Sequence, residues 1–463
     1  MGRRVAPFVF NWRMVKRLLY RSFYRSAGLN YRLRALTPVG WFLLVGMLAA
    51  GAIGIDTSEA MSFQTFALIC AAFFIAGLWY CLPPPRLELV RELPRYASVG
   101  TRLAYCVRIT NPDRRTGLDL ALEENFGEFR PTRDEFLRWK EPGEEKRNAF
   151  DRASGYYRWL WLLDRKRPAS SEEIALPILL PNSETVVTME AVPLRRGPLR
   201  FEPALLSARD PLGIARRSSR VGERQTLLIL PKIYHLPPQA MLGRREYMLG
   251  GTAPATSVSG FEEFVSIRDY RYGDPLRHVH WRSSARVGQL LVREFEDQFL
   301  VRQAIILDTF DRHLFPEVFE EAVSVAASYA TALRSSESFL DFLLVTDESA
   351  SSPTQQSVSE AGNTLETLAA VHPCRDKPIQ QLTDLVMANL PRFGGVVCIL
   401  LDWDEPRQEL VRRIRESGTS FQVILMLEEG ASKPIVAGVL EDRPELLICL
   451  EAGHIESGLA QLR

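Results

Sequence analysis

The sequence predicts an α/β protein with a β-rich domain, joined to two N-terminal transmembrane helices. Three observations predict this. Two uncharged apolar runs stand near the N-terminus, short strand-like runs separated by turn residues follow them, and apolar strands alternate with amphipathic helices after about residue 300. The chain has 463 residues, which is enough for about three domains.

The charge balance argues against nucleic acid as a partner. Lys and Arg number 57 and Asp and Glu number 56, so the net charge is only +1. The first 36 residues are the exception, because they contain nine Lys or Arg and no Asp or Glu. We expect residues 1–36 to form a basic cytoplasmic tail that faces anionic membrane lipid.

The two apolar runs are Val39–Ile55 and Phe63–Leu82, and we place a transmembrane hairpin at residues 37–83. Basic residues flank the hairpin on both outer sides, so both flanks are expected in the cytoplasm. A buried core hairpin is the alternative. Within the tail, a helix at Trp12–Arg25 would have an apolar face and a basic face, as a helix lying on the inner leaflet does, but a solvated tail explains the pattern equally well. The apolar face would consist of Trp12, Val15, Leu19 and Phe23, and the basic face of Arg13, Arg17, Arg21 and Arg25.

A β-sandwich-like domain is predicted for residues 84–235, because short strands are separated by Gly, Pro and Asn turn signals. A polar, aromatic insert interrupts it at residues 127–168. The predicted strands are Leu87–Arg91, Arg102–Thr110, Leu118–Glu123, Ile174–Leu180, Thr185–Val192 and Thr226–Leu230.

Residues 300–463 are predicted to form a doubly wound parallel sheet covered by helices on both faces. The predicted strands are Gln303–Leu307, Asp341–Val345, Val396–Leu401 and Phe421–Leu427, and the predicted helices are Pro316–Arg334, Gly362–Val371, Ile379–Leu390 and Arg407–Ser417. The glycine-rich phosphate loop GxxxxGK[ST] is absent from the sequence.

The most distinctive segment is residues 236–299, and it carries a resemblance to a known family. Its spacing of charged, aromatic and glycine residues is similar to the signature of a bacterial family of unknown function, the fifty-eighth in the domain-of-unknown-function series. The signature residues are Gly260, Glu263, Phe264, Arg268, Asp269, Tyr270, Gly273, Asp274, Arg277, Trp281, Arg286, Arg293 and Glu294.

This resemblance extends over nearly the whole chain and implies a partner. Arg195–Arg196–Gly197 and Asp210–Pro211–Leu212–Gly213 match two further motifs of the family. The family implies a von Willebrand factor A-like domain at residues 300–463 and location in the bacterial inner membrane. It also implies a MoxR-type AAA+ ATPase as the protein partner, since members are typically encoded beside one.

Two interpretations of the signature segment stay open. Its alternating charges could form an internal network that fixes the neighbouring domains, or they could form a docking surface for a partner. A third, catalytic interpretation uses Asp274, His278 and His280 as the site of a hydrolase, with Ser283 and Ser284 close by in the sequence.

A metal site is the remaining candidate. The von Willebrand pattern places Asp-x-Ser-x-Ser after the first strand, and here Asp308 matches while Phe310 and Arg312 replace the serines. Asp311, Asp347, Asp402 and Asp404 would gather at the same edge of the sheet, where Mg²⁺ could bind their carboxylates. Because Arg312 could neutralise this cluster, Mg²⁺ is disfavoured and no cofactor is expected.

Taken together, these features predict a non-enzymatic, two-pass membrane scaffold or adaptor with cytoplasmic domains. It would work with a MoxR-type ATPase in assembling or activating a protein complex. The alternative is a hydrolase that uses the Asp274, His278 and His280 region.

Overall fold

The computed structural model of the chain divides into two compact units, Met1–Leu230 and Pro231–Arg463, and each is described by itself. The basic tail is described only in part. The structure describes residues 19–26, 35–53, 60–82, 86–113, 116–237, 257–311, 317–334, 339–345, 361–375, 377–428 and 438–460.

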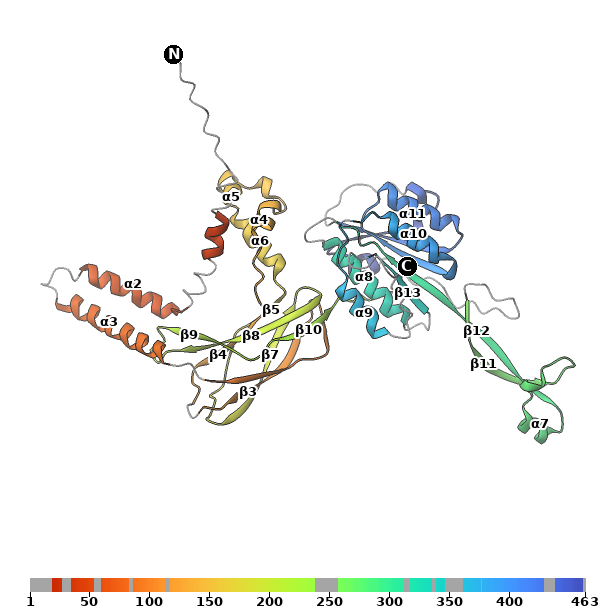
Figure 1. Cartoon of the computed structure of the whole chain (residues 1–463), viewed down its shortest axis with the longest axis horizontal. Helices are drawn as coiled ribbons and strands as arrows, with labels where there is room; N and C mark the ends of the chain where they lie inside the picture. The colour runs from red at the N-terminus through yellow and green to blue at the C-terminus, as the bar shows by residue number, and fades with distance from the viewer. Residues whose placement is uncertain are drawn as a thin grey trace, which may run out of the picture. The chain divides into compact units, whose positions relative to one another are not determined.

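The first unit contains two apolar helices in contact with each other, α2 (Pro38–Ile53) and α3 (Ala60–Cys81) (Figure 1). At about 1.5 Å per residue, the 22 residues of α3 can cross a hydrocarbon core of roughly 30 Å. The 16 residues of α2 fall short of that length. In the part of the chain that the structure describes, one helix, at Met61–Cys81, is therefore long and apolar enough to span a membrane.

The end of the basic tail forms a helix at residues 19–26 that packs on the insert. The ring of Tyr20 lies 5.7 Å from that of Trp159, and the ring of Phe23 lies 6.2 Å from that of Phe136. The aromatic face expected to meet lipid or water is therefore covered by protein, which corrects both expectations for this part of the tail. Residues 12–18 lie outside the described residues.

The insert is helical, with α4 (Arg133–Arg138), α5 (Ala149–Ser154) and α6 (Tyr156–Lys166). Helix α4 begins with a capping box, in which Thr132 and Glu135 satisfy each other's backbone amides. The buried guanidinium of Arg158 donates from Nε to Glu144 at 2.9 Å. These local interactions order a segment that is too polar to form a core of its own.

The β-rich part consists of two sheets. Their inner faces share one core that includes Val107, Met189, Phe201 and Ile229. All pairs are antiparallel except β2 with β10. One sheet has the order β1 (Glu88–Glu92), β3 (Leu103–Asn111), β7 (Ser183–Pro193), β5 (Ala169–Ser171); the other has the order β2 (Tyr96–Ser98), β10 (Gln225–Leu230), β8 (Gly197–Arg209), β4 (Leu120–Asn125), β6 (Ile174–Ala175), with β9 (Arg216–Val221) beside β8.

A buried ion pair lies within this core. Arg91 donates from Nε to Glu124 at 3.0 Å, and its other nitrogens donate to the carbonyls of Glu202 and Glu223. The Tyr105 hydroxyl donates to the same carboxylate at 2.9 Å. Burial, together with the charge of Glu124, raises the pKa of Tyr105 far above its usual value. The phenol therefore stays protonated as a donor.

The second unit is built on a parallel sheet with the order β13-β12-β14-β15-β16. The chain runs from β12 to β13 on one side and then crosses to β14 on the other. The topological switch point therefore lies between β12 and β14. The strands are β12 (Leu291–Leu307), β13 (Phe339–Leu343), β14 (Gly395–Leu400), β15 (Ser420–Leu427) and β16 (Leu447–Glu451).

Helices cover both faces of this sheet, as the sequence predicted. Ile305 and Leu307 of β12 pack with α8 (Glu317–Arg334), α9 (Ala361–Ala370) and α12 (Ile455–Ala460). The alternate residues Ala304 and Ile306 pack on the other face. The helices of that face are α10 (Gln380–Asn389) and α11 (Glu405–Glu416).

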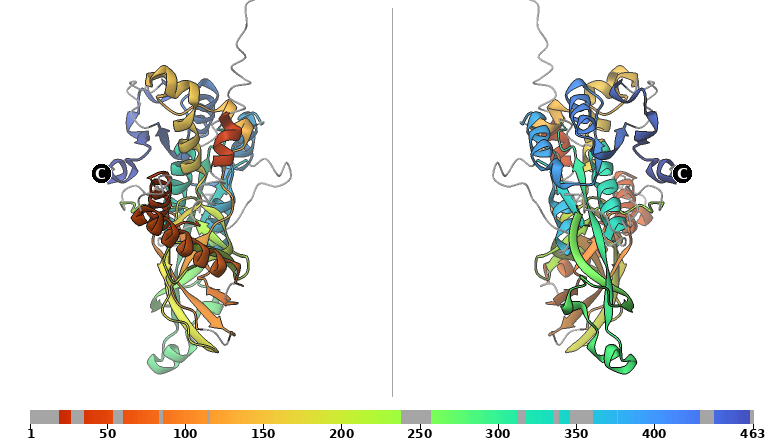
Figure 2. Two further views of the ribbon diagram at one scale, coloured as in Figure 1. Left: turned by 90° about the vertical axis from the view of Figure 1, so that its left-hand side faces the viewer. Right: turned by 90° about the vertical axis from the view of Figure 1, so that its right-hand side faces the viewer.

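The signature segment forms a two-stranded ribbon. Strand β11 (Ser257–Asp269) pairs antiparallel with the first part of β12, as far as Val301. The short helix α7 (Trp281–Val287) lies at the end of the ribbon (Figures 1 and 2). Strand β12 therefore belongs both to the ribbon and to the parallel sheet.

Removal of the buried guanidinium should destabilise the first unit. Arg91→Met leaves the Glu124 carboxylate buried without its cation, which costs roughly 3–5 kcal/mol. We expect a correspondingly lower unfolding midpoint of the full-length protein in detergent. The control is Arg102→Met, because the side chain of Arg102 is 82% exposed and lies 3.8 Å from Glu190. Equal effects of the two variants would contradict the prediction.

Candidate functional site

The end of the ribbon, residues 270–290, is called the tip. It is closed by its own backbone, since Tyr270 N donates to Leu290 O at 2.9 Å and His280 N donates to Leu291 O at 2.8 Å. Val279 and Val292 are buried and form a small bridge beneath it. The tip is therefore an ordered structure that presents defined side chains.

Asp274 and Arg268 form the main ion pair at the tip. Arg268 donates to the two carboxylate oxygens at 2.7 and 2.9 Å, and the backbone amide of Arg271 donates at 2.8 Å. These hydrogen bonds, that of Arg268 first, lower the pKa of Asp274 to about 2. Arg268 also lies 3.7 Å from Glu294. Asp274 thus fixes the turn that begins the tip.

The remaining arginines of the tip point outward. Arg277 is exposed and donates to the ring of His278 at 3.1 Å. Arg282 and Arg286 are exposed and form no ion pair with any residue that the structure describes. Instead of a network, the described charged residues of the tip form one strong pair and leave several cations free for a partner.

Large apolar side chains are exposed beside these arginines. Tyr272 is fully exposed, and Trp281, Leu276 and Val287 are 64%, 61% and 59% exposed. Aromatic residues and arginine together are the side chains most enriched at protein interfaces. The tip combines both on a small, rigid structure.

The residues of the catalytic interpretation have structural roles. His280 caps α7, since its Nδ1 accepts from the backbone amide of Ser283 at 3.3 Å and lies 2.6 Å from the Ser283 hydroxyl. The Ser284 hydroxyl accepts from the amide of Leu291 at 2.9 Å. Both carboxylate oxygens of Asp274 are taken by Arg268. The geometry therefore gives a serine–histidine contact, and within the described ranges no carboxylate is hydrogen-bonded to His280.

The other predicted signature residues lie along the ribbon. Asp269 and Arg293 are exposed on β11 and β12, and Glu294 accepts from the Ser266 hydroxyl at 2.7 Å. Gly273 adopts a φ of +108°, a conformation that favours glycine in the turn. Gly260 and the side chains of Glu263 and Phe264 lie outside what the structure describes.

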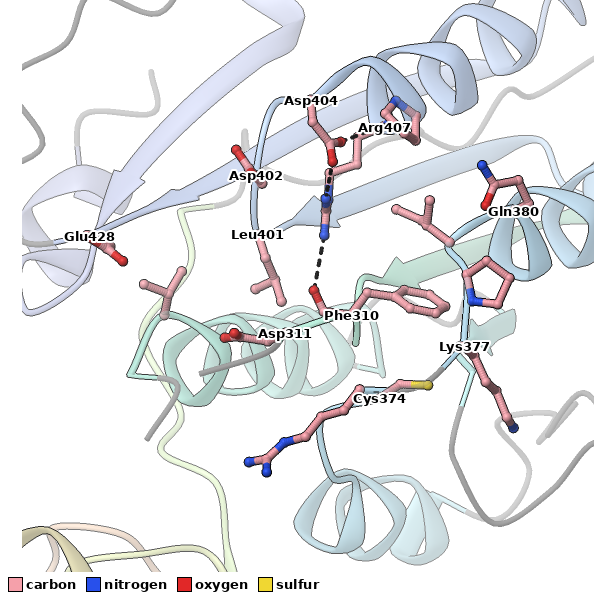
Figure 3. Close-up of a pocket in the computed structure, with 15 residues that line it drawn as sticks. Phe310, Asp311, Cys374, Lys377, Gln380, Leu401, Asp402, Asp404, Arg407 and Glu428 are labelled. Carbon is pink, nitrogen blue, oxygen red and sulfur yellow. Dashed lines mark hydrogen bonds and ion pairs between the residues drawn. The ribbon is translucent and has the colours of Figure 1, made fainter. Parts of the chain in front are cut away.

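A second candidate site is a cavity of about 560 Å³ at the switch point of the parallel sheet (Figure 3). It opens where β12, β14 and β15 end, and α10 and α11 begin at it. Ligands commonly bind at this edge of α/β sheets. Its charged lining consists of Asp311, Arg375, Lys377, Asp402, Asp404, Arg407 and Glu428.

The centre of this edge is the buried pair of Asp308 and Arg407. Arg407 donates from Nε to Asp308 at 2.6 Å, from Nη1 to Asp404 at 2.8 Å and from Nη2 to the carbonyl of Phe310 at 3.1 Å. Asp308 is fully buried and also accepts from the amides of Phe310 and Leu401. Burial would lower the pKa of Arg407, but the carboxylates of Asp308 and Asp404 raise it on balance. The guanidinium therefore stays charged.

These residues do not fit a Mg²⁺ site. Both oxygens of Asp308 already accept hydrogen bonds from the protein, and Phe310 offers no ligand oxygen on its side chain. Asp311, Asp402 and Asp404 do line the same cavity, but no group of three or more His, Cys, Asp or Glu side chains in the described ranges is arranged to hold a metal ion. The Arg407 guanidinium supplies the positive charge at this edge.

Sequence reasoning missed Arg407. It proposed Arg312 as the neutralising residue, and Arg312 lies outside the described residues, as does Asp347. The available signal was local: Asp404 stands three residues before Arg407, at the start of a predicted helix, where an N-cap aspartate and a basic residue can pair. Nothing in the spacing links Asp308 to Arg407, which is 99 residues away.

The doubly wound sheet with its ribbon defines an α/β protein with an extended surface element. A model of the family described as "Protein of unknown function DUF58" matches residues 266–431, which include the whole tip and the residues that line the switch-point cavity. The resemblance stated from the sequence is therefore confirmed over these residues.

One described relative matches over part of its length. The chain is 27% identical over 146 residues to "Uncharacterized protein YeaD" of Bacillus subtilis (strain 168). The match covers 31% of this chain and about a third (34%) of that protein.

Solved structures give weak similarities. The CARDB domain of the PF1109 protein from Pyrococcus furiosus is 10% identical and covers 32% of this chain and 89% of its own, with a TM-score of 0.17. A cohesin module from Clostridium perfringens is 11% identical, and the match covers 32% of this chain and 98% of the module, with a TM-score of 0.16. These scores are too low to support an argument about fold or function.

Loss of the Arg407 guanidinium should destabilise the second unit. Arg407→Met leaves Asp308 buried without its cation, at a cost of roughly 3–5 kcal/mol. Arg412→Met is the control, since the side chain of Arg412 is 41% exposed on the same helix.

Millimolar Mg²⁺ should leave the unfolding midpoint of the wild-type protein unchanged, because both oxygens of Asp308 already accept hydrogen bonds. A midpoint that rises with Mg²⁺ and loses this response in Asp308→Asn would refute the assignment.

The tip should keep its ion pair at neutral pH. The pKa of Asp274 is lower in the folded tip than in the unfolded chain, where it is about 3.9. The ionised carboxylate therefore stabilises the fold fully at pH values above about 3.9, and this contribution is lost as the pH falls toward about 2. The carboxyl resonance of Asp274, assigned with Asp274→Asn in ¹³C-aspartate-labelled protein, should titrate near that lower value. Arg268→Gln should move the midpoint upward; an unchanged midpoint would show that Arg268 does not control it.

Proposed function

We propose that this chain is a non-enzymatic, membrane-anchored adaptor that docks a protein partner through the tip of its ribbon. The observation that carries the proposal is the exposure of Tyr272 and Trp281 beside Arg282 and Arg286, two exposed cations that pair with no carboxylate in the described part of the chain. A partner would bury the exposed aromatic rings and remove them from water. Acidic residues on that partner would attract the two arginines, which carry like charges.

The partner we propose is a MoxR-type AAA+ ATPase, working with this chain to assemble or activate a protein complex. The family similarity of residues 266–431 supports this choice, because the resemblance implies such an ATPase. We also assign the parallel sheet to a von Willebrand factor A-like domain, which the strand order around the switch point supports. In this assignment Arg407 takes the place that a metal ion would have.

We place the protein in the bacterial inner membrane as a two-pass hairpin with cytoplasmic domains. The length and apolar surface of α3 support one crossing. The contact of α2 with α3 and the basic residues of the tail support α2 as the second. With both crossings in place, the tip lies on the same side of the membrane as a cytoplasmic ATPase.

The tip should be the contact point in the cell. A photo-crosslinking amino acid at Tyr272 or Trp281 of the full-length protein should capture an AAA+ ATPase, identified by mass spectrometry. Adding Arg282→Glu and Arg286→Glu should weaken capture at least about tenfold, since opposite charges become like charges. The free energy of unfolding should change by less than about 0.5 kcal/mol, because both side chains are exposed.

The crosslinker at Val186, which is 56% exposed on β7, is the control site. Equal capture from Val186 and from the tip would mean that the tip is not the docking surface. The observation in favour of the hydrolase alternative is the contact between His280 Nδ1 and the Ser283 hydroxyl. Ser283→Ala that keeps the fold and the partner but fails to complement a deletion would support the hydrolase over the adaptor.

A further inference from the structure

A second cavity, of about 830 Å³, opens in the first unit beside the C-terminal end of α3. Trp79 and Leu82 of this helix end line it, together with residues of β4, β8 and β9. Trp79 also packs against the core of the two sheets. With α3 in a bilayer, this cavity lies at the level of the lipid head groups, where tryptophan is enriched.

One part of the cavity wall is apolar. Leu118 and Ile178 contribute to it although they are 60% and 63% exposed. The other apolar lining residues are Leu120, Leu206, Ala208 and Pro211. An acyl chain that enters from the bilayer would cover these side chains and remove them from water.

The cavity wall also carries three arginines, Arg86, Arg209 and Arg217. Arg217 is held by the helix end, since its Nη1 donates to the carbonyl of Tyr80 at 3.2 Å. The side chains of Arg86 and Arg209 are exposed. Guanidinium groups bind phosphate oxygens in a bidentate manner, so this wall fits the phosphate of a phospholipid.

The lining also contains a carboxylate with an unused oxygen. Asp210 is 2% exposed, and its Oδ1 accepts from the amide of Ala215 at 2.8 Å. Its Oδ2 is buried without a hydrogen-bond partner among the described residues. Asp113 and Asp119 line the same cavity. A ligand with an ammonium group would satisfy this oxygen and balance the acidic side chains.

From these observations we infer that the cavity binds one phospholipid with a zwitterionic, amine-bearing head group. The arginines hold the phosphate, Asp210 receives the ammonium group, and the wall around Leu118 and Ile178 covers an acyl chain. The inference requires α3 to lie in a bilayer, but it is independent of the tip and its partner.

Native mass spectrometry of the full-length protein in detergent tests this site. On titration with phosphatidylethanolamine, one saturable lipid should bind per chain, and phosphatidylglycerol should bind about tenfold more weakly because it lacks the ammonium group. Arg209→Gln should weaken phosphatidylethanolamine binding by about the same factor. Asp210→Asn keeps the oxygen that accepts from Ala215 and should abolish the preference between the two lipids.

Two matched controls keep the test specific. Arg220→Gln changes an exposed arginine of β9 whose side chain points to the other face from Arg217, and Val186→Ser matches Ile178→Ser. The controls should bind as the wild type does, while Ile178→Ser should bind more weakly. Equal binding by all variants, equal binding of both lipids, or uptake of many lipids without saturation would each overturn the inference. If carbonate extracted the full-length protein from membranes, α3 would not lie in a bilayer, and the inference would lose the condition on which it rests.

Discussion

The second unit depends on one continuous strand. Residues of β12 from Arg302 onward bond to β13 and β14 on its two sides, while those up to Val301 pair with β11 and, at Val292, also with Val279 of the tip. A break in this strand would interrupt the direct connection between the tip and the sheet, because β12 is the strand that the ribbon and the sheet share. The tip is therefore joined to the parallel sheet by a strand that belongs to both.

The edge of the same sheet shows how a buried carboxylate can be satisfied from within an α/β scaffold. Three helices begin near the carboxyl ends of the parallel strands, an arrangement that commonly recruits a ligand or an ion. Here Arg407 satisfies Asp308 from within the protein, so the central charge is neutralised by the fold itself. The consequence is a stable switch point whose remaining acidic and basic side chains surround the cavity instead of coordinating a cation at its centre.

The sequence predicted most strands in whole or in part but missed β2, β5, β8, β9, β11 and β16. For β8 the reason is physical. Pro198 and Pro203 stand within that strand, and proline removes a backbone donor, so such a run is normally excluded from the interior of a sheet. In the structure Pro203 lies at an irregularity in the pairing of β4 with β8, where the regular ladder is interrupted. The insert was missed as helix for a different reason: its aromatic residues gain their burial partly from Tyr20 and Phe23, more than a hundred residues earlier in the chain.

The sequence by itself determined what depends on short-range patterns: an apolar span in α3, strands alternating with helices after residue 300, and a signature segment crowded with arginines and aromatic residues. Hydropathy and periodicity carry this information because each element must match its own surroundings. Only the tertiary structure decided which charges meet. It paired Asp308 with Arg407 and Arg91 with Glu124, and among the described residues it gave Arg282 and Arg286 no ion-pair partner. Pairing depends on how distant segments fold together, and local spacing does not encode it.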